Sequence, residues 1–262
     1  MSRYDKVGDA AKRVITLFFM VDVSGSMSGE KIGTVNSTMY GMLPAIRDIS
    51  MKNTDTLIKI AVLTFSSETR WMTQEDLKIP TDVMDFMWED LNALGITVFG
   101  KACLELNNKL SPNEFMGDIP GSCAPVIILL SDGEPVDEYY ADLAGLQRND
   151  WYRNATKAAI AIGNDVDFKV LEEFTGNRDN VVHVYDVNDL RDWLEFVTIT
   201  AVEINSTGSD IIKNKNAALT DAILARRMVE PGHSTEEELI YPTVTGTLPP
   251  EPQDFGTGIT RR

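Results

Sequence analysis

The sequence is poor in the residues that build disulfide or zinc scaffolds. Cys103 and Cys123 are the only cysteines among 262 residues, and their spacing fits neither a disulfide framework nor a zinc site. The two histidines, His183 and His233, have no partner at the spacing of metal ligands or of a catalytic pair. We therefore expect a protein of a reducing compartment whose function does not depend on cysteine or histidine.

Positive charge is also scarce. The chain has 24 Lys and Arg against 40 Asp and Glu, a net charge of −16, and it shows no basic stripe. Nucleic acids and anionic membranes are bound by clustered Lys and Arg that neutralise phosphates. The charge balance therefore predicts that neither is a partner.

Long apolar runs are missing as well. Residues 14–21 follow Lys12 and Arg13 and resemble the start of a signal peptide, but the run ends at Asp22 and lacks a small-residue cleavage site. A membrane-spanning helix needs about 20 apolar residues, which this run does not reach. We interpret the run as a buried strand and expect a cytoplasmic protein.

Short apolar runs alternate with helical patterns along most of the chain. This alternation predicts an α/β fold, a doubly wound and mostly parallel sheet with helices on both faces. Apolar residues at spacings of three and four predict helices at residues 30–50, 100–110 and 190–204, and a short one at 166–174 that begins at Asp165. Strands are predicted at residues 14–21, 57–65, 126–130, 158–162 and 181–185.

The composition changes near residue 205, which suggests a domain boundary. We predict an N-terminal extension at residues 1–11, one domain at 12–204 and a flexible C-terminal tail at 205–262, with one short helix near 217–229. The segment from 231 onward is rich in Pro, Gly, Thr and Glu. A segment with few large apolar residues cannot offset the conformational entropy of ordering itself.

The most informative motif follows the first apolar run. Asp22, Ser24 and Ser26 alternate in a turn between a predicted strand and a predicted helix, so their oxygens can converge from one loop. In open parallel sheets, the carboxyl edge is where loops from several strands meet and where ligands bind. Two further loops, which carry Thr97 and Asp132, lead to the same edge. Carboxylate and hydroxyl oxygens suit Mg²⁺ or Mn²⁺, and Ca²⁺ less well.

In this order and spacing, the five residues resemble the von Willebrand factor type A family, whose metal-ion-dependent adhesion site (MIDAS) has the pattern Asp-x-Ser-x-Ser, a distant Thr and then an Asp. The resemblance implies that the serines and the threonine contact the ion, that the aspartates act largely through waters, and that a protein partner donates an Asp or Glu carboxylate. Ile96 stands where the family usually has a second Gly before Thr97.

Within that family the chain resembles the bacterial TerY-like branch, which is associated with tellurium resistance and stress gene clusters. The likeness covers roughly residues 13–203 and includes the segments 22–30, 63–65, 131–135 and 159–163. It implies a scaffold or adaptor in phospho-signalling, with a protein kinase and a metal-dependent serine/threonine phosphatase as partners.

Two enzyme classes are disfavoured by single residues. A magnesium-dependent phosphotransferase of the haloacid-dehalogenase kind needs a second aspartate two residues after Asp22, where Ser24 stands. A serine hydrolase needs serine at the centre of a Gly-x-Ser-x-Gly turn, where Met27 stands. A structural assembly subunit that uses its tail, with the ion only stabilising loops, remains an alternative.

The carboxylates that follow the third loop are interpreted differently from those of the motif. Asp137, Glu138 and Asp142 are close in sequence and have the pattern of a solvated acidic helix face. We therefore leave them unassigned, with tuning of the local electric field at the site as the alternative.

Overall fold

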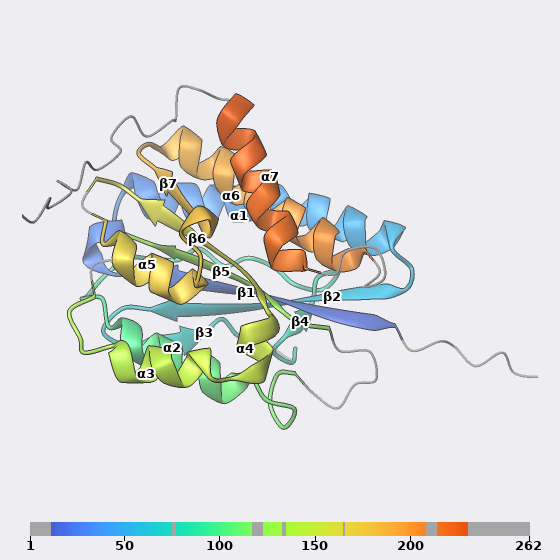
Figure 1. Ribbon diagram of the computed structural model, residues 1–262, viewed down its shortest axis with the longest axis horizontal. Helices are drawn as coiled ribbons and strands as arrows, with labels where there is room; N and C mark the ends of the chain where they lie inside the picture. The colour runs from blue at the N-terminus through green and yellow to red at the C-terminus, as the bar shows by residue number, and fades with distance from the viewer. Residues whose placement is uncertain are drawn as a thin grey trace, which may run out of the picture.

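The computed structural model describes residues 12–74, 77–116, 123–132, 135–164, 166–207 and 214–229. Figure 1 shows a central twisted sheet between two layers of helices. The sheet has seven strands in the order β3-β2-β1-β5-β6-β7, with β4 pairing to β2 outside this path. The predicted fold class, a mostly parallel α/β sheet covered on both faces, is confirmed.

The five predicted strands form the parallel part of the sheet. Two short antiparallel strands on β2 were not predicted, because two or three residues at a sheet edge are too few to produce a periodic apolar pattern. The parallel strands are β1 (Arg13–Asp22), β2 (Thr56–Phe65), β5 (Val126–Ser131), β6 (Thr156–Ile162) and β7 (Val181–Val184), and the antiparallel ones are β3 (Thr69–Trp71) and β4 (Thr81–Asp82).

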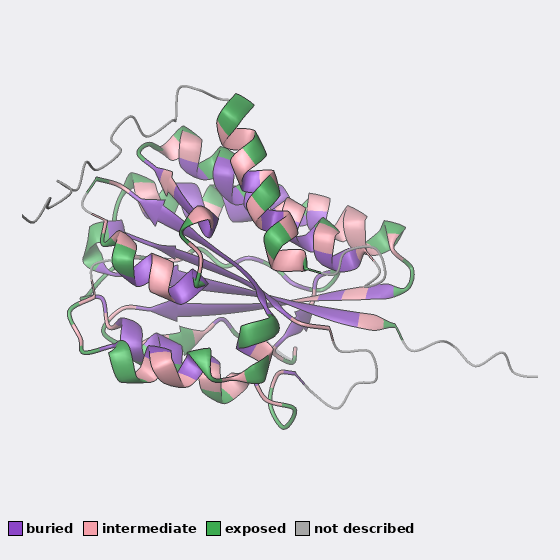
Figure 2. Cartoon of the chain, viewed as in Figure 1, coloured by how far each residue is buried: buried purple, intermediate pink, exposed green. Residues whose placement is uncertain are grey.

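Both faces of the sheet are buried, which explains why its strands are continuous apolar runs. On β1, Leu17 and Phe19 pack into one core while Phe18 and Met20 pack into the other. Figure 2 shows the resulting buried sheet beneath helices whose outer sides are exposed. No helix in the described part of the chain is both long and apolar enough to cross a bilayer.

The helices fall into two groups, one on each face. The first face is covered by α1 (Glu30–Lys52), α6 (Val187–Ser206) and α7 (Lys215–Val229), and the second by α2 (Phe99–Lys109), α3 (Tyr140–Gln147), α4 (Asp150–Asn154) and α5 (Phe168–Thr175). The helices α3 and α4 were not predicted, because they are short and their apolar residues show little periodicity.

The short helix predicted to begin at Asp165 begins later. Asp167 is the residue before α5, and its side chain accepts a hydrogen bond from the backbone N–H of Lys169. An aspartate in this position satisfies an otherwise unpaired amide of the first helical turn. Asp165 itself lies outside the described residues.

Helix α7 lies within the predicted tail, yet it is packed on the domain. Leu219 and Ile223 are fully buried in the first core. The Asn216 Oδ1 accepts hydrogen bonds from Lys157 N at 3.0 Å and from Asn180 Nδ2 at 3.2 Å. Residues 215–229 therefore belong to the folded domain, whereas the predicted extension at 1–11 and the residues from 230 onward lie outside the described part.

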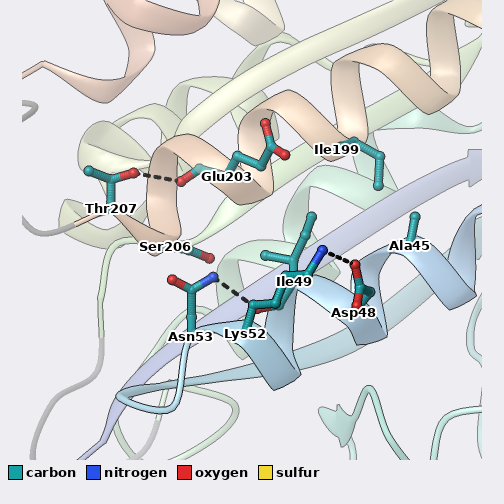
Figure 3. A pocket seen from close by; sticks show the side chains of 9 residues that line it. All are labelled: Ala45, Asp48, Ile49, Lys52, Asn53, Ile199, Glu203, Ser206 and Thr207. Atoms are coloured by element: carbon teal, nitrogen blue, oxygen red, sulfur yellow. Dashed lines mark hydrogen bonds and ion pairs between the residues drawn. The ribbon is translucent and has the colours of Figure 1, made fainter.

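A shallow groove of about 370 Å³ lies where α1 and α6 end, at the amino edge of the parallel strands. Figure 3 shows polar side chains on both walls, with Lys52 paired to Asp48 on α1 and Thr207 bonded to the Glu203 carbonyl on α6. Of its three charged side chains, Lys52 and Asp48 form an ion pair, and the Glu203 carboxylate is the third.

Candidate metal centre

The carboxyl ends of two neighbouring strands bring the predicted aspartates together. Val21 of β1 lies opposite Leu130 of β5, so Asp22 and Asp132 leave the sheet at the same edge. Asp22 is fully buried, and both of its carboxylate oxygens accept hydrogen bonds. Oδ1 accepts from the Ser24 backbone N–H at 2.8 Å and Oδ2 from the Ser131 hydroxyl at 2.8 Å.

The two serines lie in a tight turn after Asp22. The Ser24 and Ser26 hydroxyl oxygens are 3.0 Å apart, Ser24 is buried and Ser26 is exposed. One 3-10 turn, Gly25–Met27, holds this arrangement, and the buried Met27 side chain anchors the turn in the core. Two hydroxyl oxygens are thereby presented side by side next to the Asp22 carboxylate.

Asp132 has a buried oxygen without a donor. Among the described residues, its Oδ1 has no hydrogen-bond partner, while its Oδ2 lies 3.5 Å from the Lys31 ammonium nitrogen. A buried carboxylate oxygen left without a partner costs free energy, so such an atom calls for a cation or a donor. This oxygen, beside one more carboxylate and two hydroxyls, fits a hard divalent ion.

The loop that carries Thr97 is tied to the other two loops by its backbone. Gly95 O accepts from Gly25 N at 2.9 Å, and Thr97 O accepts from Val136 N at 2.9 Å. Thr97 is 6% exposed. The described hydrogen bonds do not join its hydroxyl to the other four side chains, so its role as a ligand stays a prediction.

The departure at Ile96 does not distort this loop. Gly95 has a φ of +96°, and a Cβ there would lie 2.6 Å from the Ser67 hydroxyl oxygen, so glycine is needed at 95. Ile96 instead extends its side chain into solvent, with 55% of its surface exposed. The single glycine is sufficient to bring the loop against the Asp22 turn.

The electrostatics of the site favour a bound cation. Burial raises the pKa of the Asp22 carboxyl; the hydrogen bonds from Ser24 and Ser131 lower it, and the nearby charge of Asp132 raises it. Two carboxylates in a buried setting repel each other, and a divalent ion between the loops would relieve that repulsion. In the described part of the chain, no group of three or more His, Cys, Asp or Glu side chains could hold a metal, so an ion here would depend on hydroxyl oxygens.

The interpretation of Asp137 from the sequence was wrong. Asp137 is not a solvated residue of an acidic helix face, because its carboxylate accepts from the backbone N–H of Phe99 at 2.9 Å and of Gly100 at 2.7 Å. It therefore caps α2, and Gly100 leaves room for this approach. The pairing spans nearly forty residues, and no local sequence signal marks it.

Ser131 and Lys31 were also not assigned roles from sequence. Ser131 holds Asp22, and Lys31 neutralises part of the Asp132 charge. The position of Ser131 directly after a buried strand is the signal that could have indicated its role. Lys31 lies one residue inside α1 and reaches the site only through the fold.

The von Willebrand factor type A domain matches residues 16–198, well over half of the chain. The chain belongs to the von Willebrand factor type A family. The five residues predicted to form the MIDAS, Asp22, Ser24, Ser26, Thr97 and Asp132, all lie within the matched region. Among curated proteins, none matches the chain.

Solved structures share the fold at low sequence identity. The von Willebrand type A protein VWA2, an ArnB paralog from Sulfolobus acidocaldarius, is 20% identical with a TM-score of 0.51, over 71% of this chain and 45% of that one. The pilus adhesin SpaC from Lactobacillus rhamnosus GG is 14% identical with a TM-score of 0.54, over 74% and 30%.

A third structure carries a metal. Proximal thread matrix protein 1 from the mussel byssus, solved with a zinc-occupied MIDAS motif, is 15% identical with a TM-score of 0.54, over 74% of this chain and 48% of that one. The chain thus spans less than half the length of each of these proteins. At such identities the likeness establishes the fold.

Proposed function

We propose that this domain is a non-catalytic protein-interaction module that works through a divalent metal ion held by Asp22, Ser24, Ser26, Thr97 and Asp132. The observation that carries the proposal is the buried Asp132 Oδ1 without a hydrogen-bond partner among the described residues. It lies at the same edge as the Asp22 carboxylate and the Ser24–Ser26 hydroxyl pair. The zinc-occupied MIDAS of the mussel protein supports metal binding at this position of the fold.

The all-oxygen donor set favours Mg²⁺ or Mn²⁺ over softer metals, and Ca²⁺ fits less well. Neutral hydroxyls quench the charge of an ion poorly, so the bound ion stays electrophilic and attracts an outside carboxylate. We therefore propose that a partner protein donates an Asp or Glu side chain to the ion. The chain's net charge of −16 does not prevent this, because charges are screened beyond about 8 Å in physiological salt.

The TerY-like motifs extend the proposal to a biological role. They support a cytoplasmic scaffold or adaptor in a bacterial stress or phospho-signalling system, with a protein kinase and a metal-dependent serine/threonine phosphatase as partners. Binding both partners would bring a kinase and its opposing phosphatase to one place.

The residue two positions after Asp22 argues against a phosphotransferase. A nucleophilic aspartate of the haloacid-dehalogenase kind needs an acid/base carboxylate at that position. In this chain Ser24 occupies it, and a serine hydroxyl is not an acid/base group at neutral pH. The site is therefore better suited to holding an ion than to attacking a phosphate.

Titration with metal ions, measured by isothermal calorimetry, tests the proposal. The wild-type chain should bind a single Mn²⁺ or Mg²⁺ ion, and Asp22→Asn should weaken that binding by at least about tenfold. Asp55→Asn, which changes an exposed carboxylate directly before β2, at the opposite edge of the sheet, is the matched control. Equal metal affinity of wild type and Asp22→Asn would refute the site.

A second experiment tests the partners. Tagged protein is captured from its host's lysate with millimolar Mg²⁺ and, in parallel, with a chelator, and the co-purifying proteins are identified by mass spectrometry. A kinase or phosphatase retained with Mg²⁺ and lost with chelator would support the scaffold role. Retention of the partner in both conditions would show that its binding does not depend on the ion and uses another surface.

A further inference from the structure

Three apolar side chains protrude into solvent around the candidate metal centre. Leu94 is 81% exposed, Ile96 55% and Val136 65%. The Leu94 N–H donates to Val23 O at 2.7 Å, and the Val136 N–H donates to Thr97 O at 2.9 Å. The first bond joins the Leu94 loop to the turn that carries Asp22 and Ser24, and the second joins the Val136 loop to Thr97. We call Leu94, Ile96 and Val136 the apolar rim.

The loop that carries Leu94 and Ile96 is held in place by its backbone. Besides the bond from Gly25 N to Gly95 O, the Ile96 N–H donates to the Ser67 hydroxyl at 3.2 Å. The Val98 N–H donates to Ser66 O at 3.1 Å. Because these bonds anchor the loop on both sides of Ile96, the two apolar side chains cannot turn inward without breaking them.

Exposed apolar surface of this kind is unfavourable in water, by about 25 cal/mol for each Å² that burial would remove. Several exposed apolar side chains on loops beside a ligand site point to an interaction surface. An anchored loop is also well suited to binding, since little conformational entropy is lost when a partner packs on it.

The exposed charges near the rim indicate what its partner carries. Glu30 follows the Asp22 turn and Glu138 follows Val136, and both are exposed. Two neighbouring positive charges are already paired, Lys31 with Asp132, and Lys101, which also donates to Ser67 O, with Glu68. Together with the net charge of −16, this surface complements a partner with basic residues.

We propose that the apolar rim selects a protein segment in which the metal-coordinating Asp or Glu is flanked by apolar side chains and surrounded by basic residues. This proposal rests on the proposed function, because the coordinating carboxylate positions the segment over the rim. The ion supplies the common anchor, and the rim discriminates between segments that all carry a carboxylate.

A library of displayed random cyclic peptides, selected on the immobilised full chain with Mg²⁺ and eluted with a chelator, tests the rim. The eluted peptides should share an acidic residue with apolar neighbours and with Lys or Arg beyond them. On the variant Leu94→Ser/Ile96→Ser/Val136→Ser, the acidic residue should persist and the apolar enrichment should disappear. A peptide selected on wild type should bind this variant about tenfold more weakly.

The matched control replaces equally exposed apolar residues elsewhere. Met51→Ser/Met228→Ser/Val229→Ser changes the ends of α1 and α7 and should leave peptide binding unchanged. Mn²⁺ titration and thermal melting of both triple variants should match wild type, which separates a lost contact from a lost fold.

The outcomes distinguish the rim from the function on which it rests. Chelator-eluted peptides with no apolar enrichment, or equal affinity for the rim variant, would overturn the rim and leave the metal-dependent module intact. Self-association of the chain that the rim variant abolishes would also overturn it, by assigning the surface to a second copy. If wild type yields no chelator-eluted peptide, the proposed function and the rim both fail.

Discussion

The two edges of the parallel sheet differ in the hydrogen bonding of their buried polar groups. At the amino edge such groups join elements: Asn180 Nδ2 donates to Lys157 O at 2.9 Å, and Thr220 of α7 donates to Asn180 Oδ1 at 2.6 Å. At the carboxyl edge, Asp132 keeps an oxygen without a partner. Asn205 Oδ1 and Ser206 Oγ, at the end of α6 near the amino edge, also lack a partner, but they belong to a neutral amide and a neutral hydroxyl. In the described part of the chain, Asp132 Oδ1 is the only such atom on a carboxylate.

This difference separates stability from function within one sheet. Hydrogen bonds at the amino edge fasten α7 and the strand beginnings, and in the nearby groove of Figure 3 the Lys52 ammonium pairs with the Asp48 carboxylate. The carboxyl edge instead combines an under-satisfied carboxylate with exposed apolar side chains. A group that is costly in the absence of ligand becomes favourable once an ion binds, so binding energy concentrates at that edge.

The largest effect is expected from a substitution that removes metal binding at the carboxyl edge and leaves the amino edge intact. Asp132→Ala should weaken Mn²⁺ binding by about 100-fold or more, or about 3 kcal/mol, because it removes one of the two carboxylates of the site. Without metal, the thermal midpoint should stay the same or rise, since a poorly paired buried charge is lost. Calorimetry with and without Mn²⁺ measures both. A large loss of metal-free stability would contradict the comparison.

The next largest effect is expected from a substitution that removes hydrogen bonds at the amino edge and leaves the metal site intact. Asn180→Ala removes a fully buried side chain that bonds to Lys157, Asn216 and Thr220, and should lower the free energy of unfolding by about 2–3 kcal/mol. Amide hydrogen exchange in α7 should rise with it. Metal affinity should be unchanged, and a parallel loss of Mn²⁺ binding would show that the two edges are coupled.

A smaller effect is expected from a substitution that raises the metal affinity at the carboxyl edge. Lys31→Met removes a positive charge 3.5 Å from the Asp132 Oδ2 and should raise Mn²⁺ affinity by about tenfold, or about 1.4 kcal/mol, by relieving repulsion between like charges. Lys52→Met, at the far end of the same helix, is the control and should leave the affinity at the wild-type value. Weaker binding by Lys31→Met would mean that the lysine positions Asp132 for the ion.

The smallest effect concerns the pH dependence of the amino edge. Burial lowers the pKa of Lys157 to about 8 from its ordinary value of 10.5, so between these values the unfolded chain binds more protons than the folded one. Stability contributed by this group should therefore rise with pH, by about 1 kcal/mol from pH 8 to pH 9. Denaturant unfolding should show a smaller rise in Lys157→Met than in wild type, and the remaining rise includes Lys215, whose pKa burial also lowers.

Much of the fold could be predicted because its determinants are local. Continuous apolar runs such as residues 14–21 and 57–65 identify strands buried on both faces, and regular spacing identifies α1 and α6. The alternation of the two implies parallel pairing. The sequence did not predict four short elements, the edge strands β3 and β4 and the helices α3 and α4. Contacts with neighbouring elements stabilise them more than any periodic pattern of apolar residues in their own sequence.

The candidate site divides in the same way. Asp22, Ser24 and Ser26 lie in one turn, so their proximity followed from spacing, and the structure places Asp132 at the end of the adjacent strand. That these residues and Thr97 bind an ion stays a prediction. Asp137 was misread because a helix cap formed by a residue far away in sequence leaves no local mark.

The sequence by itself determined the layered α/β architecture and the order in which the site residues arrive, because periodicity and turn chemistry act over a few residues. Only the tertiary structure decided which carboxylate oxygen stays without a hydrogen-bond partner, which apolar side chains remain exposed, and that α7 packs on the domain. These properties depend on contacts between segments as distant as Lys31 and Asp132, and hydrogen bonding and burial are settled only when such segments meet.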